Sequence, residues 1–130
     1  MQDPDKPAGA RGAVFFEGIV TIAVRKTGNA AILDLKGPLK MGDAEQSFRD
    51  QVDDLLKQGI RNLAINLAGV PEMDSSGIGA LVRAFSAAKQ AGGKCKFFSA
   101  PKRVKQTIKM VRLENVLEVV EDEAAALASF

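Results

Sequence analysis

The chain has 130 residues, of which 46% are hydrophobic and 26% charged, and its formal net charge at neutral pH is +2. This length and composition predict one globular domain with a single hydrophobic core. Because the chain has no histidine and only one cysteine, Cys95, the sequence excludes a Ser-His-Asp triad, histidine metal sites, thiolate zinc clusters and an internal disulfide. A Gly-x-x-x-x-Gly-Lys phosphate loop is also missing. We therefore expect a cofactor-free binding module rather than an enzyme, and the lone thiol favours a reducing cytoplasm.

The N-terminal part predicts a flexible leader and then a β-hairpin. Residues 1–17 mix prolines and glycines with charges, as flexible segments do, so we expect the domain itself to occupy residues 18–130. No apolar run approaches the roughly 20 residues that cross a bilayer. Alternating residues over 18–25 predict a strand, Thr27-Gly28-Asn29 predicts a turn, and residues 31–35 predict the returning strand.

The rest of the chain alternates helices with short apolar strands. A helix is predicted over 43–57, with Asp43 as its N-cap and Gly59 as its stop. After it the sequence predicts a strand over 60–67, a helix over 75–91, a strand over 95–98, a helix opening at Pro101, a strand over 117–120 and a helix over 121–130. Strands joined by helices imply parallel crossovers. We therefore predict an α/β fold, in which an N-terminal hairpin and a βαβαβ unit share one mixed β-sheet with helices packed on it.

Apolar residues at helical and strand spacing identify the core. On the helix that opens at Pro101 the buried residues should be Val104, Ile108 and Val111, and alternation along the preceding strand predicts that both Phe97 and Phe98 are buried. The wider predicted core contains Val52, Leu55, Ile65, Ile78, Leu81, Phe85 and Ile108.

The most informative stretch lies between the strand over 60–67 and the helix over 75–91. Asp74 stands where a helix N-cap is expected, and Ser75 and Ser76 open the helix. At 100° per residue, Ser76 points away from the apolar face and Ser75 lies on its flank, which predicts that Ser76 is the more exposed. A surface serine at a helix start is a natural place to add or remove a phosphate. The same Asp-Ser-Ser-Gly composition is also ordinary helix-start chemistry in proteins with no site there.

The sequence Met73-Asp74-Ser75-Ser76-Gly77-Ile78-Gly79, after Leu63-Ala64-Ile65-Asn66-Leu67, resembles the signature of the STAS domain, the family of anti-sigma factor antagonists. The predicted order of a hairpin, a helix and two βαβ units also resembles this fold, and the likeness extends over residues 18–130. The resemblance implies an anti-anti-sigma factor that binds an anti-sigma factor with serine-kinase activity. Phosphorylation would abolish that binding, and a phosphatase would restore it.

The resemblance also assigns roles to single residues. It implies that Ser75 is the phosphate acceptor, with Asp74, Ser76, Gly77 and Lys40 forming the surrounding partner-binding environment. Lys40 departs from the family pattern, since these antagonists commonly carry an acidic residue there. A cation at this position could hold a phosphate, change which kinase docks, or be a solvated loop lysine. Domains of the family also serve in stress-sensing scaffolds and in lipid or anion transport systems, and these roles stay open as alternatives.

Basic residues crowd the helix that opens at Pro101, namely Lys102, Arg103, Lys105, Lys109 and Arg112. Such density can mark a nucleic-acid-binding face. However, the net charge is only +2 and the chain has no Tyr or Trp for base stacking. We therefore favour a solvated face or a patch for an acidic protein partner, and we expect no DNA binding.

Overall fold

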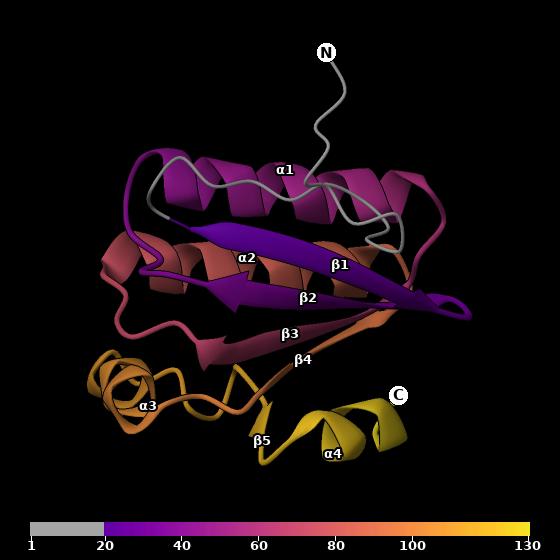
Figure 1. The fold of residues 1–130 in the computed structure, drawn as a ribbon. Helices are drawn as coiled ribbons and strands as arrows, with labels where there is room; N and C mark the ends of the chain where they lie inside the picture. Colours follow the sequence, from indigo (N-terminus) through magenta and orange to yellow (C-terminus); the bar gives the residue numbers. More distant parts are fainter. Residues whose placement is uncertain (1–19) are drawn as a thin grey trace.

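The computed structural model describes residues 20–130, which form five strands and four helices (Figure 1). In chain order these are β1 (Thr21–Thr27), β2 (Ala30–Lys36), α1 (Asp43–Lys57), β3 (Asn62–Gly69), α2 (Ser75–Gln90), β4 (Lys94–Phe98), α3 (Lys102–Met110), β5 (Val119–Val120) and α4 (Glu123–Ala128). The predicted leader over 1–17 lies outside the described residues, as does the start of the predicted first strand. Within the described part, no helix has both the length and the apolar character needed to cross a membrane.

The five strands form one mixed sheet in the order β1-β2-β3-β4-β5. β1 and β2 are an antiparallel hairpin, and its turn contains Gly28, whose φ of +62° lies in the left-handed region that glycine adopts readily. The other three pairings are parallel, and a helix connects the two strands of each. The predicted α/β fold with an N-terminal hairpin and parallel crossovers is confirmed.

One face of the sheet is covered by α1 and α2, and α3 adds Val104 and Ile108 to the same hydrophobic core (Figure 1). On this face Leu33, Ile65 and Phe97 stand opposite one another in register on three neighbouring strands, and all are buried. The members of the predicted core that are buried are Val52, Leu55, Ile65, Ile78, Leu81 and Ile108. Phe85 is only half-buried and packs against the edge of the core.

The opposite face is only partly covered, by α4 (Figure 1). There a small apolar cluster of buried residues contains Ile32, Ala64, Phe98 and Ala126. The predicted burial of both Phe97 and Phe98 is therefore confirmed, with one phenylalanine in each layer.

Beside this cluster the same face carries a polar network. Arg25 Nε donates to Asp34 Oδ2 at 2.7 Å, and Arg25 Nη2 donates to Glu123 Oε1 at 2.7 Å. Asn66 Nδ2 donates to Asp34 Oδ1 at 2.7 Å. The network joins β1, β2, β3 and α4 through charged and polar side chains.

Three predictions of helix detail are wrong. The N-cap of α1 is Gly42, with a φ of +107° and no side-chain cap bond, rather than Asp43, which is the first helical residue. Val111 is 43% exposed because α3 ends at Met110 and the chain then turns away from the core. The last helix begins at Glu123 rather than at residue 121, because Asp122 caps it.

Several strand boundaries also differ from the prediction: β1 ends at Thr27 rather than at residue 25, and β3 ends at Gly69 rather than at residue 67. Residue Ile60 does not begin β3, since its backbone N–H donates to Leu55 O and completes the end of α1. β5 contains only Val119 and Val120, whereas the prediction began at Leu117. Leu117 is buried but belongs to the turn after α3, where its N–H donates to Leu113 O.

Candidate functional site

The candidate site lies where two loops leave the carboxyl ends of β2 and β3 and run side by side. Gly37 N–H donates to Gly69 O at 2.8 Å, and Leu39 N–H donates to Glu72 O at 3.1 Å. Leu39 also forms an isolated parallel bridge with Met73, and both side chains are buried. The loop that precedes α2 is therefore held against the loop that precedes α1.

Asp74 joins these two loops to the first turn of α2. Its Oδ1 accepts from the backbone N–H of Gly77 at 2.9 Å, which confirms the predicted N-cap, and its Oδ2 accepts from the N–H of Met41 at 3.1 Å. Burial by itself would raise the pKa of the Asp74 carboxyl, but these backbone donors outweigh it and hold the pKa below its ordinary value. One ionised carboxylate thus fixes both the helix start and the neighbouring loop.

Gly77 is required by the close approach of the same loop. A Cβ at this position would lie 2.2 Å from Leu39 O, a distance that real Cβ atoms do not reach. Any larger residue would push the 37–42 loop away from the first turn of α2. The glycine of the Asp-Ser-Ser-Gly sequence therefore has a packing reason, which the sequence alone did not reveal.

Ser75 is the first residue of α2 and is exposed, whereas Ser76 is half-buried. The prediction from helical periodicity, that Ser76 would be the more exposed, is wrong. That argument treats the side of the helix opposite the core as open to solvent. In the structure the loop carrying Leu39 and Met41 packs against this first turn, which the periodicity argument leaves out.

Lys40 lies in an ion-pair cluster at the edge of this junction. Its Nζ is 3.0 Å from Glu72 Oε2, and Arg103 Nη2 at the start of α3 is 3.9 Å from Glu72 Oε1. The hydrogen bond from Lys40 lowers the pKa of the Glu72 carboxyl. The sequence reasoning singled out Lys40 but missed Glu72, which faces it across the two paired loops.

Met41 is the second residue that the sequence reasoning missed. Its side chain is 74% exposed, and its backbone is bound to the Asp74 carboxylate. Exposed methionines are enriched at protein interfaces, where the unbranched thioether adapts to a partner surface. The only signal in the sequence was a large apolar residue between Lys40 and Gly42, in a loop.

The remaining sequence candidates lie apart from this junction. Lys105, Lys109 and Arg112 are exposed along α3 and the turn after it, and only Arg103 of the basic residues there meets the Glu72 cluster. Cys95 is buried in β4, where desolvation raises the pKa of its thiol. Among residues 20–130, no group of acidic, cysteine and histidine side chains could hold a metal ion.

Several known structures share the fold of this chain. The structure is similar to an anti-sigma factor antagonist from Mycobacterium paratuberculosis, with 13% identity and a TM-score of 0.73 over 87% of this chain and 95% of that chain. It is similar to the Bacillus cell fate determinant SpoIIAA in its phosphorylated form, with 14% identity and a TM-score of 0.66 over 83% of this chain and 96% of that one.

The fold also occurs inside a larger protein, the murine Solute Carrier 26 family member A9 anion transporter. Here the identity is 18% and the TM-score 0.68, over 81% of this chain but only 18% of the transporter. At these identities the structural likenesses show the fold alone. The sequence model of the STAS domain family, however, matches residues 21–126, nearly the whole described part. The chain belongs to the STAS domain family.

Proposed function

We propose that this chain is an anti-sigma factor antagonist that binds an anti-sigma factor with serine-kinase activity and is switched off by phosphorylation of Ser75. The observation that carries the proposal is the exposed hydroxyl of Ser75 at the first residue of α2, on a junction fixed by Asp74 and Gly77. The family match and the likeness to anti-sigma factor antagonists support it.

In the proposed reaction the partner kinase transfers the γ-phosphoryl group of ATP to Ser75 Oγ, which forms a phosphate ester and releases ADP and a proton. This chain is the substrate and supplies no catalytic group. A phosphatase restores the hydroxyl by hydrolysis. The lone buried thiol of Cys95 fits a reducing cytoplasm as the setting for this cycle.

Charge explains why such a switch acts at the interface rather than in the fold. A phosphate adds about −1.5 to −2 charges. The helix N-terminus stabilises an anion by about 0.3–1 kcal/mol, and the ionised Asp74 next to Ser75 repels it, so the two effects nearly cancel in the free protein. Burying the same dianion against a partner without new cationic contacts would cost several kcal/mol. Since 1.4 kcal/mol is about tenfold in affinity, binding would be lost while the fold persists.

The neighbouring residues supply the rest of the proposed binding surface. Met41 is exposed and its N–H is bound to the carboxylate of Asp74, the residue before Ser75, so it offers a partner an apolar contact near the proposed switch. Lys40 and Arg103 pair with Glu72, three positions before Ser75, and add positive charge to this surface. A phosphate on Ser75 would compete with Glu72 for these cations.

The proposal is tested by phosphopeptide mapping and titration calorimetry with the cognate kinase-type anti-sigma factor. Ser75→Ala should abolish phosphorylation and leave the affinity within about twofold, because it removes one exposed hydroxyl. Ser75→Asp should weaken binding, though less than a phosphate, since it brings one charge rather than nearly two. Ser76→Ala is the matched control for the site of modification and should leave the phosphate on Ser75. Phosphate found only on Ser76, or full affinity in Ser75→Asp, would show that the switch is misassigned.

A second candidate is a subunit of a lipid or anion transport system, and the likeness to a domain of an anion transporter favours it. The two candidates differ in the partner that the unmodified chain retains. Affinity capture on the immobilised full chain, read by mass spectrometry, should recover a kinase-type anti-sigma factor under the first proposal and a transporter permease under the second.

A further inference from the structure

The C-terminal end of α3 presents apolar side chains to solvent. The described chain exposes four large hydrophobic side chains, and three of them, Met110, Val111 and Val116, lie at the end of α3 and in the turn after it. Met110 is 82% exposed. The helix buries only Val104 and Ile108, so its last residues stand clear of the core. Apolar side chains gathered in one exposed segment mark an interaction surface.

The turn after α3 is closed by backbone hydrogen bonds. The N–H of Leu113 donates to Ile108 O at 3.1 Å, and the N–H of Arg112 donates to Lys109 O at 3.0 Å. These two bonds form the Schellman pattern of a helix C-terminus. Glycine usually takes the left-handed position of this motif, but here Arg112 takes it, with a φ of +61°. Met110 is therefore exposed on a hydrogen-bonded turn rather than on a frayed helix end.

Cations surround these exposed apolar residues. Residues 102–116 contain five lysines and arginines and only one acidic residue, Glu114. Lys105, Lys109 and Arg112 are exposed, and among residues 20–130 no carboxylate lies within ion-pair distance of any of the three. Their charges are therefore available to an anionic partner.

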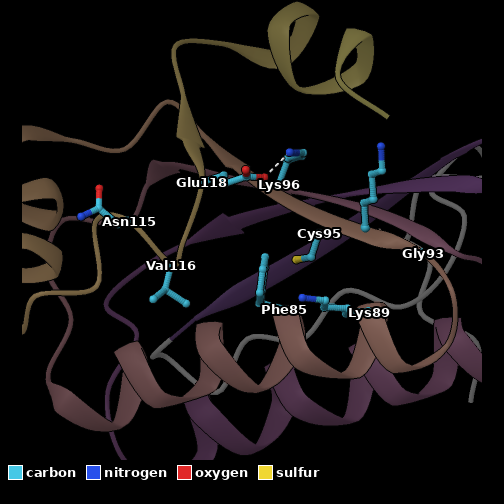
Figure 2. Close-up of a pocket in the computed structure, with 9 residues that line it drawn as sticks. Phe85, Lys89, Gly93, Cys95, Lys96, Asn115, Val116 and Glu118 are labelled. Carbon is cyan, nitrogen blue, oxygen red and sulfur yellow. Dashed lines mark hydrogen bonds and ion pairs between the residues drawn. The ribbon is translucent and has the colours of Figure 1, made fainter.

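A cleft of about 550 Å³ continues this surface between α2 and the segment that follows α3 (Figure 2). Figure 2 shows Val116 on one side of the cleft, with Phe85 and Lys89 of α2 across from it. Lys94 also lines the cleft and is exposed. The combination of apolar and cationic side chains thus extends from the end of α3 to the end of α2.

An anionic bilayer matches this surface better than an acidic protein does. Interfaces between proteins are enriched in aromatic residues and depleted in lysine. Residues 102–116 contain three lysines and no aromatic residue. Clusters of about four to eight lysines and arginines on a helix that also offers apolar side chains are typical of segments that bind anionic phospholipids.

We propose that the end of α3 docks this chain on the surface of an anionic phospholipid bilayer. Met110 and Val111 would enter the boundary between headgroups and acyl chains, and Lys105, Lys109 and Arg112 would contact lipid phosphates. Apolar burial and the attraction between cations and headgroups act together in such binding. Ser75 precedes Lys89 by 14 positions, about 20 Å along the axis of α2, so the docking surface is separate from the candidate switch.

Sedimentation of the full chain with lipid vesicles tests the proposal. One set of vesicles contains phosphatidylglycerol and phosphatidylcholine, and the other contains phosphatidylcholine alone. We expect the chain to sediment with the anionic vesicles and to stay in solution with the neutral ones. An excess of glycerol phosphate should not release it, because a free headgroup offers no apolar phase for Met110.

Matched variants locate the contact. Met110→Ser should weaken binding to anionic vesicles about tenfold, whereas Met41→Ser, which changes the other strongly exposed methionine, should leave it within about twofold. Lys109→Glu should also weaken binding about tenfold. Lys57→Glu makes the same change in net charge on α1 and should stay within about twofold.

Fluorescence reports insertion directly. The chain contains no tryptophan, so Met110→Trp places a single indole at the end of α3. Its emission should shift to shorter wavelength when anionic vesicles are added, because the ring leaves water. Met41→Trp is the matched control and should show no shift. Ser75→Asp should sediment like the parent chain, so this proposal succeeds or fails independently of the phosphorylation switch.

Three results would overturn the proposal. Vesicle binding without an emission shift in Met110→Trp would show adsorption by charge alone. Equal weakening by Lys57→Glu and Lys109→Glu would mean that net charge, rather than the end of α3, determines binding. Failure to sediment with anionic vesicles, together with binding of polyglutamate that Lys109→Glu abolishes, would assign the surface to an acidic protein instead.

Discussion

On one face of the sheet, α1 and α2 cover a continuous apolar core that includes Leu33, Ile65 and Phe97 from neighbouring strands. On the opposite face, α4 covers a much smaller cluster around Phe98, and an ion-pair network of Arg25, Asp34 and Glu123 occupies the surface beside it. The two faces use the same strands, since successive side chains point to opposite sides. They differ in how much apolar surface a helix removes from water.

Because the two faces bury different amounts of apolar surface, they should contribute unequally to the stability of the domain. Burial of apolar area is the main stabilising term in folding, so the α1–α2 face should carry most of the free energy of unfolding. α2 belongs to that face and also presents Ser75 at its start. The candidate switch therefore stands on a helix of the larger core, where a change of surface charge can alter binding without unfolding the domain.

The largest expected loss of stability comes from replacing a buried isoleucine with alanine, and it should differ between the two faces of the sheet. Ile65→Ala should cost about 4 kcal/mol and Ile32→Ala about 2 kcal/mol, because both side chains are buried but Ile32 lies in the smaller cluster, which can relax around the cavity. Urea melts with a shared m-value measure both losses. Equal losses would mean that the two faces contribute alike.

Removing either of the two capping aspartates should cost less stability, and the cost should differ between them. Asp74→Ala should cost about 1–2 kcal/mol, because the side chain holds both Gly77 and Met41, whereas Asp122→Ala should cost about 0.5–1 kcal/mol. Asp122 caps only the six-residue α4. Hydrogen exchange should show local opening of α4 in the second variant and protection of α2 unchanged. Loss of α2 protection in the Asp122 variant would contradict the independence of the two faces.

The Arg25–Asp34 ion pair should contribute less to the free energy of unfolding than the Asp74 cap does. In a double-mutant cycle with Arg25→Ala and Asp34→Ala, we expect a coupling free energy of about 0.5–1 kcal/mol, since both side chains are partly exposed. The coupling should shrink in 1 M salt, where the screening length is about 3 Å. A coupling that is insensitive to salt would indicate a buried pair instead.

The smallest effect is the pH dependence of the Asp74 cap. Because the pKa of Asp74 is lowered in the folded state, its contribution is present above the unfolded pKa of about 3.9 and is lost as the pH falls through the folded value. Asp74→Asn keeps a capping oxygen but does not titrate. The stability difference between the parent and this variant should therefore stay constant above about pH 5 and shrink as the pH falls through the lowered pKa of Asp74. A constant difference would mean that Asp74 does not titrate differently in the two states.

Features governed by local chemistry were predictable from the sequence. The bounds of α1, the hairpin turn at Gly28 and the Asp74 cap follow from periodicity, turn residues and capping preference. Features governed by contacts between distant segments were not. The close packing at Gly77 depends on Leu39, in a loop more than thirty residues earlier in the chain.

The same limit applies to the charges beside the candidate site. The Lys40–Glu72 pair forms only because two loops run side by side. This arrangement has no local signal in the sequence. The family resemblance implied that Ser75 is the phosphate acceptor, but the physical reason for Gly77 required the fold.

The order of the strands in the sheet, which follows their order in the chain, also bears on how the protein is made. As residues 20–130 leave the ribosome, each new strand can join the edge of a sheet already formed, and none has to be inserted between two paired neighbours. Loop closure then spans only one helix at a time, which keeps its entropic cost small. The three parallel pairings each have to close over a helix, which is slower than forming local contacts alone. Synthesis and folding can therefore proceed in the same direction along this chain.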